Sequence, residues 1–297
     1  MRVAVTGATG LIGRRVVAAL RERGDEVTVL SRDPRQGERW DPVREPAPAR
    51  ALAGRDAVVH LAGENIAQRW TAPAKQAIEE SRVQATRNLV AALAALSADE
   101  RPRTLLSGSA IGYYGAHGDE PIDEETPAGN GFLAQTCAAW EAEAEAAEAL
   151  GVRVVRMRTG VVLDQAGGAL AKMLPPFKLG VGGPVAGGRQ YVSWIEPEDL
   201  VGIATAALED ERWQGAVNAT SPSPARNGEL AKALGRALHR PALLPVPGAA
   251  LRLLYGEMAE VLTSGARVLP ARALMNGYEF RYPELDAALR AALSRSS

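Results

Sequence analysis

The stretch VAVTGATGLIG, residues Val3–Gly13, decides the fold of this chain. A short apolar strand ends in three glycines spaced G-x-x-G-x-x-G, and an amphipathic helix follows. Gly7 allows a sharp strand-to-helix turn, Gly10 lets backbone N–H groups approach a pyrophosphate, and Gly13 lets the helix pack close to the sheet. The alternative is a tight turn without a ligand, but a second strand at Val27–Leu30 completes the context of a dinucleotide-binding fold.

Composition narrows the class of protein. The 297 residues carry a net charge of −1, which argues against nucleic acid or an anionic membrane as the main partner. No apolar run approaches the roughly 18 residues of a membrane-spanning helix. The single cysteine, Cys137, excludes an internal disulfide and is typical of a reducing, cytoplasmic location. The three histidines are too dispersed for a metal site, so we expect no metal.

The first half of the chain alternates strands and helices, which predicts an α/β fold with a Rossmann-like, doubly wound parallel sheet. Expected strands are Arg2–Thr6, Glu26–Ser31, Ala57–Leu61, Thr104–Ser107 and Arg153–Arg158, and expected helices are Leu11–Arg23, Pro73–Leu96 and Phe132–Leu150. Thr71 is a plausible N-cap, with Pro73 in the first turn.

The second half predicts a smaller C-terminal α/β lobe. Prolines and glycines crowd Pro175–Gly188, which we expect to be a loop, and Ile195–Leu208 should return to the sheet layer. We assign residues 1–165 and about 190–220 to a dinucleotide-binding domain. Residues 166–189 and 221–297 form what we call the C-terminal lobe.

The end of the second expected strand decides between NAD and NADP. An acidic residue there accepts hydrogen bonds from the ribose 2′-hydroxyl, whereas an arginine accommodates a 2′-phosphate. The chain has Ser31-Arg32 at this point, and Arg35 lies close by. The two arginines favour NADP(H). The alternative is that Asp33 accepts a hydrogen bond from the 2′-hydroxyl of NAD(H).

Further blocks extend the pattern over nearly the whole chain. They are TGATGLIG (6–13), HLAGENIAQRW (60–70), SR (81–82), SGSAIGYYG (107–115), RTGVVL (158–163), the long block 175–200, NATSPSPARNGELAKALGRALHRP (218–241) and GYEFRYPEL (277–285). With these blocks, the chain resembles the extended short-chain dehydrogenase/reductase superfamily. More narrowly, it is similar to an uncharacterised "epimerase family" branch of sugar-nucleotide-epimerase-like proteins.

This resemblance implies a set of cofactor-binding residues around NADP(H). Leu61, Ala62 and Gly63 would line the adenine and pyrophosphate side, Ser107 would lie beneath the nicotinamide, and Arg158, Gly160 and Val161 would wall its far end. Arg82 stands where extended relatives usually have asparagine, so it either contacts the cofactor or a bound anion, or is a solvated helix arginine. The full expected set is Gly7, Thr9, Gly10, Leu11, Ile12, Gly13, Ser31, Arg32, Arg35, Leu61, Ala62, Gly63, Glu64, Arg82, Ser107, Arg158, Gly160 and Val161.

The catalytic helix departs from the superfamily pattern. Relatives carry a tyrosine and a lysine four residues apart, and the lysine lowers the pKa of the tyrosine that serves as general acid/base. Here the helix reads FLAQTCAAWE from Phe132, so Thr136 or Cys137 stands near the tyrosine position and Trp140 near the lysine position. No lysine lies between Lys75 and Lys172, so the usual chemistry has no such pair.

Several residues are candidates to replace that pair. Ser109 matches the serine that contacts the substrate hydroxyl in the family. Tyr113 or Tyr114 could supply a phenol near the nicotinamide, or could only pack under the loop. Cys137 is either a weak acid or reactive thiol, or a small buried hydrophobe, which is the commoner role. Glu141 would be a base if buried, but so acidic a helix favours a solvated face.

For the other polar residues of interest, the sequence predicts either a structural role or two alternative roles. Glu64 and Asn65 should overhang the cofactor, whereas His60 is expected to be a satisfied core histidine. Lys172, Lys178 and Arg189 flank the glycine-rich loop and either hold a substrate diphosphate or are solvated. Glu196 stands where relatives of this branch usually have histidine, so a histidine-dependent role is lost.

Two functions follow from these residues. The first is an NADP(H)-dependent oxidoreductase or epimerase-like enzyme that acts on a hydroxyl or carbonyl carbon of a small molecule, such as a nucleotide sugar, with Ser109, Tyr113 and Cys137 as catalytic candidates. The second is a catalytically silent NADPH-binding sensor or scaffold. A homodimer is allowed but not required.

Overall fold

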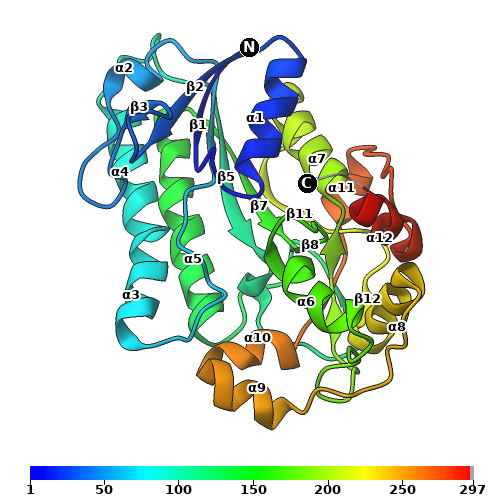
Figure 1. Ribbon diagram of the computed structural model, residues 1–297. Coiled ribbons are helices and arrows are strands. Elements are labelled where there is room, and N and C mark those ends of the chain that lie inside the picture. Colours follow the sequence, from blue (N-terminus) through cyan, green and yellow to red (C-terminus); the bar gives the residue numbers. More distant parts are fainter. Residues whose placement is uncertain (295–297) are drawn as a thin grey trace.

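A seven-stranded parallel sheet forms the centre of the computed structural model, which describes residues 1–294 (Figure 1). Its strand order is β11-β7-β5-β4-β1-β2-β3. The strands are β1 (Arg2–Thr6), β2 (Glu26–Ser31), β3 (Glu38–Arg39), β4 (Ala57–His60), β5 (Thr104–Ala110), β7 (Arg153–Thr159) and β11 (Gly215–Ala219). This order confirms the expected doubly wound, Rossmann-like sheet.

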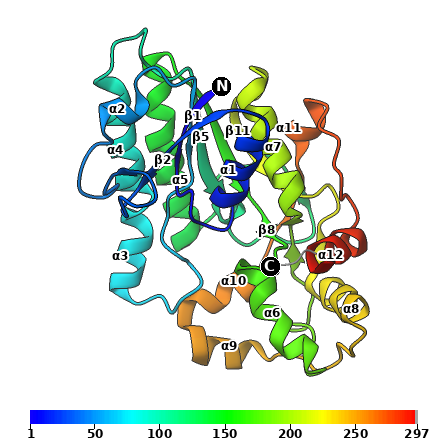
Figure 2. The ribbon, with the colours of Figure 1, turned by 45° about the horizontal axis from the view of Figure 1, so that its top comes forward.

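Helices cover both faces of the sheet, as Figures 1 and 2 show. On one face, Val3 and Val5 of β1 share a hydrophobic cluster with α1 (Gly13–Glu22) and α7 (Pro197–Glu209). On the other, Ala4 packs in a cluster with α2 (Ala49–Leu52), α4 (Val83–Ala94), the end of α5 (Phe132–Glu145) and the 3-10 helix η2 (Ala146–Leu150). Because side chains alternate along a strand, a strand buried on both faces reads as an unbroken apolar run.

The C-terminal lobe is mainly helical, and much of it lies beyond the carboxyl ends of the strands, whereas its segment 271–275 packs beside β11 (Figure 1). Its helices are α6 (Gly168–Lys178), α8 (Asn227–Leu238), α9 (Gly248–Tyr255), η3 (Gly256–Met258), α10 (Ala259–Thr263), α11 (Ala271–Met275) and α12 (Leu285–Ser294). A third cluster, which includes Leu174, Phe177, Leu234 and Leu289, joins α6, α8 and α12.

Three short strand pairs lie outside the main sheet, and the last two of them connect the lobe to the sheet domain. They are β8 (Val161–Val162) with β10 (Trp194–Ile195), β9 (Tyr191–Val192) with β12 (Ala225–Arg226), and β6 (Pro121–Ile122) with β13 (Arg267–Val268). The remaining elements are η1 (Ile111–Tyr114) and α3 (Ala72–Glu80).

The expected single helix over Pro73–Leu96 is two helices, α3 and α4, which meet at Ser81 and Arg82. The break lets both side chains reach the segment after β4: Ser81 Oγ accepts from the N–H of Glu64 at 2.9 Å, and Arg82 donates to the Glu64 carbonyl at 3.0 Å. The start of α3 is as predicted, since Thr71 Oγ1 accepts from the N–H of Ala74 at 3.3 Å.

The expected loop over Pro175–Gly188 is helical in its first part. Pro175 and Pro176 lie inside α6, which ends at Lys178. A proline late in a helix costs a hydrogen bond to the preceding turn, but Leu174 and Phe177 are buried on either side and hold this turn against the lobe. Ile195–Leu208 also differs in part, because β10 pairs with β8 outside the main sheet while α7 covers the sheet.

Candidate functional site

The carboxyl ends of β1 and β4 form a topological switch point. The chain runs from β1 outward to β2 and β3, then returns to β4 on the other side of β1. In open α/β sheets, ligands bind in the crevice that such a reversal creates. The glycine loop and the segments after β4 and β5 all lie at this edge (Figure 2).

The glycine loop has the backbone that a pyrophosphate needs. Gly7 has φ +68°, and a Cβ there would lie 2.5 Å from the carbonyl carbon of Leu61. A Cβ on Gly13 would lie 2.1 Å from the Gly7 oxygen. Within the described residues, the N–H groups of Leu11 and Ile12 have no backbone or side-chain acceptor, and they stand at the positive end of α1. Thr9 and Gly10 are exposed, so the loop fits an anionic ligand.

Three charged residues, Arg32, Asp33 and Arg35, follow the end of β2 and differ in their partners. Arg35 donates to both carboxylate oxygens of Asp33, at 2.8–3.2 Å, and its backbone N–H donates to the same group. The hydrogen bonds from Arg35 hold the pKa of Asp33 below its usual range. Ser31 Oγ accepts from the N–H of Asp33. Arg32 is exposed and, among residues 1–294, has no ion pair or hydrogen-bond partner for its side chain. Asp33 is thus engaged by Arg35, and Arg32 is available to a phosphate.

The segment after β4 packs against both the glycine loop and α4. Leu61 donates its N–H to the Thr6 carbonyl at 3.2 Å, and Leu61 and Ala62 lie against Gly7. Gly63 is exposed, and a Cβ on it would lie 3.1 Å from the guanidinium carbon of Arg82. The structure therefore brings Leu61, Ala62, Gly63, Glu64 and Arg82 together at the same edge.

Ser109 stands near the end of β5 and is bonded to a buried carboxylate. Its hydroxyl donates to Oε1 of Glu141 at 2.6 Å. Glu141 is 3 % exposed, so the expectation of a solvated acidic face is wrong at this position. The reason is that α5 packs this residue against β7, where Arg158 holds it through Nε–Oε1 and Nη2–Oε2 contacts of 2.8 Å each.

Arg158 lies at the centre of this buried polar cluster and contacts both Glu141 and Tyr114. It is 2 % exposed and also donates to the hydroxyl of Tyr114 at 2.9 Å. Burial opposes its charge, but the hydrogen bonds and charge of Glu141 raise the pKa of Arg158, so Arg158 keeps its positive charge. Ser107 is likewise buried, and its hydroxyl donates to the Gly108 carbonyl.

The two tyrosines of the motif differ in environment. Tyr114 is fully buried and donates to Asn218 at 2.7 Å; burial raises its pKa to about 12. Tyr113 is only partly buried, and the Arg158 guanidinium lies 3.5 Å from its ring centroid. In the described part of the chain its hydroxyl has no hydrogen-bond partner. Tyr113 is therefore the phenol that a ligand can use.

Cys137 has the environment of an inert thiol. It is 4 % exposed, and burial together with the charge of Glu141 raises its pKa to about 12. A thiol in this state is protonated at neutral pH and is a poor nucleophile. The geometry favours the buried-hydrophobe role, and we do not carry Cys137 into the reaction proposed below.

Gly160 and Val161 lie where the chain leaves β7 toward the C-terminal lobe. A Cβ on Gly160 would lie 2.5 Å from the Ser193 oxygen, and Val161 donates its N–H to the same oxygen at 2.8 Å. These contacts fix the crossing between the domain and the lobe. Val161 is partly exposed.

The C-terminal lobe also contacts residues 67–75, which follow β4, through hydrogen bonds and an ion pair. Lys172 of α6 donates to the Ala67 carbonyl at 2.9 Å, and Arg69 donates to the Leu253 carbonyl of α9 at 3.1 Å. Lys75 of α3 forms an ion pair with Glu257. Of the three cations near the glycine-rich loop, Lys172 thus reaches this segment, whereas Lys178 and Arg189 are exposed elsewhere.

Two buried carboxylates that the sequence did not single out also hold distant segments together: Glu124 borders the polar cluster around Arg158, and Asp199 lies on α7, apart from it. The Glu124 carboxylate accepts from the N–H groups of Asn218, at 2.9 Å, and Arg272, at 3.2 Å. Asp199 accepts from the N–H groups of Arg281 and Tyr282, at 2.7 and 2.9 Å. These pairs are separated by 82 to 148 residues, so no local spacing signals them.

His60 behaves as the expected core histidine. It is fully buried, and its ring nitrogens contact the hydroxyls of Thr6 and Thr86 at 2.7 and 3.1 Å. Glu196 is also buried and caps α7 by accepting from the N–H of Glu198. Over residues 1–294, no group of three or more potential metal ligands is found, and no helix is long and apolar enough to cross a membrane.

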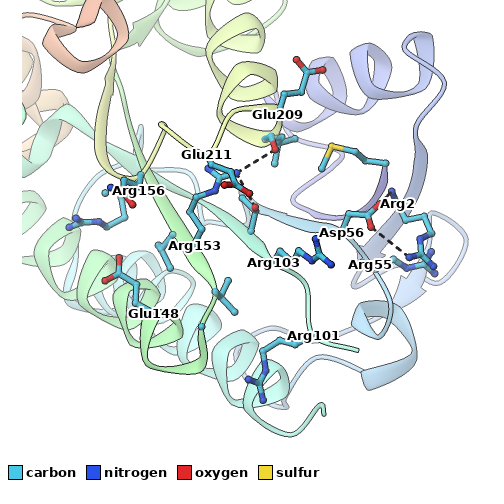
Figure 3. A pocket seen from close by; sticks show the side chains of 18 of the residues that line it. Arg2, Arg55, Asp56, Arg101, Arg103, Glu148, Arg153, Arg156, Glu209 and Glu211 are labelled. Carbon is cyan, nitrogen blue, oxygen red and sulfur yellow. Dashed lines mark hydrogen bonds and ion pairs between the residues drawn. The ribbon is translucent and has the colours of Figure 1, made fainter. Parts of the chain in front are cut away.

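A cavity of about 1190 Å³ lies at the opposite edge of the sheet, where the strands begin (Figure 3). Arginines line it, and two of them, Arg101 and Arg153, bond the ends of helices. Arg101 donates to the carbonyls of Leu93 and Leu96 at the end of α4, and Arg153 donates to the Ala207 carbonyl near the end of α7. Cations stabilise the negative ends of helices, so these arginines have a structural role.

Comparison with known proteins gives the same picture. The profile described as "NAD dependent epimerase/dehydratase family" matches residues 3–219, and one described as "Domain of unknown function (DUF1731)" matches residues 246–292. The "Epimerase family protein SDR39U1 homolog, chloroplastic" of Arabidopsis thaliana is 42% identical over 303 residues, which cover 99% of this chain and 87% of the relative. "Epimerase family protein Mb2239" of Mycobacterium bovis is 42% identical over 298 residues, with 99% and 98% covered.

A solved structure is also similar over the whole length. It is described as human epimerase family protein SDR39U1 (isoform2) with NADPH; it has a TM-score of 0.88 and 36% identity, and 99% of this chain and 100% of that chain are covered. Profile, relatives and solved structure each match most or all of the chain. The chain belongs to the NAD-dependent epimerase/dehydratase family.

Proposed function

We propose that this protein is an NADP(H)-dependent oxidoreductase or epimerase-like enzyme that acts on a hydroxyl or carbonyl carbon. The observation that carries the proposal is the pairing of an open glycine loop with an unpartnered Arg32 beside an Asp33 already engaged by Arg35. A relative of 36% identity has been solved with NADPH, which supports the choice of cofactor.

Different residues would bind the different parts of the dinucleotide. The N–H groups of Leu11 and Ile12 would bind the pyrophosphate, with Gly7, Gly10 and Gly13 allowing its approach. Arg32 would bind the 2′-phosphate. Leu61–Gly63, which pack against the glycine loop, would line the adenine and pyrophosphate side, and Glu64 would overhang the cofactor. Arg82, whose guanidinium lies over the Trp140 ring beside β5, would face the nicotinamide half. When bound, the nicotinamide supplies hydride transfer to or from a carbon.

Ser109 and Tyr113 would orient the reacting group. Ser109 gives its only hydroxyl hydrogen to Glu141, so its oxygen can accept a hydrogen bond from a substrate hydroxyl. The free phenol of Tyr113, four residues further on, would hold or deliver the proton at that oxygen. Glu141 cannot be that base, because Arg158 engages both of its oxygens.

The substrate would enter between the sheet domain, residues 1–165 with about 190–220, and the C-terminal lobe. The Lys172 amine bonded to Ala67 provides a cation beside that crevice, which suits an anionic small molecule such as a nucleotide sugar. The protein would act in the cytoplasm, and a homodimer remains open.

The first experiment is a titration of the purified protein with NADPH and NADH, followed by energy transfer from tryptophan to nicotinamide. We expect NADPH to bind at least about tenfold more tightly, and Arg32→Ala to remove this preference. Equal or absent binding would overturn the cofactor assignment. Turnover is then tested with sugar nucleotides, ketones and aldehydes by NADPH absorbance and product isomers.

A second function is favoured by one observation. By the resemblance, Thr136 or Cys137 stands near the usual tyrosine position and Trp140 near the usual lysine position, and all three side chains are buried. The chain could therefore bind NADPH as a sensor or scaffold without hydride chemistry. Ser109→Ala separates the two functions: lost turnover with an unchanged NADPH Kd supports the enzyme, whereas tight binding with no turnover on any substrate supports the sensor.

A further inference from the structure

Arg82 carries a charge that the protein itself does not neutralise by contact. It stands before the first turn of α4 and donates to the Ile78 and Glu64 carbonyls, each at 3.0 Å. A weaker contact of 3.4 Å reaches Ser81 Oγ. Within residues 1–294 it forms no ion pair, and Glu64 and Cys137 act on it only through space. Its Nε–H and one Nη2 hydrogen have no acceptor there, so two of its five donors remain for a ligand.

Trp140 holds this guanidinium in place. The guanidinium carbon of Arg82 lies 5.4 Å from the centroid of the indole ring, which is 6 % exposed. The Cη2–Cζ2 edge of the ring lies against Gly108 of β5, where a Cβ would come within 3.0 Å. The indole N–H, on the same side of the ring, is buried without an acceptor among the described residues. The stack thus bridges the ends of β4 and β5.

The stack of Arg82 on Trp140 lies near the place where the superfamily pattern has its lysine. Trp140 stands near the position where the superfamily pattern has lysine, so α5 supplies an aromatic ring there instead of a charge. Arg82 brings a charge to the same ring from α4, a neighbouring helix. Gly108, which the Trp140 ring contacts, lies between Ser107 and Ser109 on β5. The resemblance places the nicotinamide above this strand end, and β4 and β1 separate β5 from β2, where Arg32 stands.

We propose that Arg82 replaces the superfamily lysine as the cation beside the nicotinamide half of the cofactor. This inference rests on the proposed function. A fixed positive charge there favours NADPH, whose nicotinamide is neutral, over NADP⁺, whose ring is a cation. The consequence is a preference for the reduced cofactor that depends on residue 82.

The test compares the Kd of NADPH and of NADP⁺ for the wild type and for Arg82→Gln and Arg82→Lys. We expect Arg82→Gln to lower the ratio Kd(NADP⁺)/Kd(NADPH) by about tenfold, the size of a partly screened charge interaction. Arg82→Lys keeps the charge and should keep most of the ratio. Arg87→Gln is the matched control, because it removes an exposed arginine from the same helix.

Each other outcome contradicts the inference in a recognisable way. If Arg82→Gln weakens both forms equally, Arg82 binds a part that they share, such as the pyrophosphate. If neither Kd changes, Arg82 only holds the backbone of Glu64. Should Arg82→Gln fail to fold by circular dichroism, Arg82→Met is a second neutral variant whose stem still covers Trp140. A wild type that binds neither form contradicts the proposed function itself.

Discussion

The hydroxyl of Ser109 donates to the carboxylate of Glu141 across 2.6 Å, and both side chains are at least 95 % buried. Arg158 holds the same carboxylate through two further bonds. The serine that the family motif places beside the substrate is thus oriented by an ion pair from α5 and β7. The cluster thus joins the candidate site to the packing of α5 on β7.

The first prediction concerns that ion pair. Glu141→Gln removes the counter-ion of Arg158 and leaves a buried charge, so the free energy of unfolding should fall by about 3–5 kcal/mol. Denaturant unfolding followed by circular dichroism measures it. Glu143→Gln is the matched control, because Glu143 pairs with Arg87 on the surface of the same helix and its loss should cost far less. Equal costs for both variants would show that the buried pair contributes no more than the surface pair.

A second prediction follows from the Arg35–Asp33 pair. Arg35→Ala frees the Asp33 carboxylate, which then repels a 2′-phosphate and can accept from a 2′-hydroxyl. The NADPH Kd should rise by roughly threefold to tenfold, and the NADH Kd should fall. Fluorescence titration with both cofactors measures the change. Arg39→Ala removes a nearby exposed charge as the control, and a similar effect in both variants would indicate only a general loss of positive field.

The glycine loop provides a third prediction. A Cβ on Gly13 would lie 2.1 Å from the Gly7 oxygen, so Gly13→Ala must displace the loop that forms the anion site. NADPH binding should be lost, and the melting temperature should drop. Gly118→Ala is the control, since a Cβ there meets no atom within 4 Å and should be neutral or slightly stabilising. Unchanged NADPH affinity in Gly13→Ala would place the cofactor elsewhere.

The fourth prediction is a pH dependence of stability. Burial lowers the pKa of His60 to about 4, against a model-peptide value of 6.5, and its partners are the neutral hydroxyls of Thr6 and Thr86. Between about pH 4 and pH 6.5, His60 therefore binds a proton in the unfolded chain but stays neutral in the folded chain. The contribution is fully present above pH 6.5 and should decline by about 2–3 kcal/mol as the pH falls to about 4.5.

The measurement for this prediction is the free energy of unfolding at several pH values for the wild type and His60→Gln. The variant should lose stability less steeply over the same range, because other groups titrate equally in both proteins. His117→Gln, which removes an exposed imidazole, is the matched control. Parallel curves for the wild type and His60→Gln would contradict the buried, neutral state of His60.

Much of the sheet domain could be predicted from local patterns. The strands β1 and β2 match their expected bounds, because short runs of β-branched and apolar residues between turn residues identify strands. Of the two, only β1 is buried on both faces. Local propensity failed at Ser81–Arg82, where bonds to the segment after β4 end one helix and begin the next. It also failed at Pro175–Lys178, where packing of Leu174 and Phe177 outweighs two prolines.

By itself, the sequence determined the glycine loop, the doubly wound parallel sheet and the residues at the end of β2. These depend on spacing within short stretches, where backbone sterics and strand periodicity act directly. Only the tertiary structure decided the states of Glu141, Tyr113 and Arg82. Burial, ion pairing and free donor groups depend on which distant elements meet, and Arg158, 17 residues beyond Glu141 in the chain, reaches it only because α5 packs on β7.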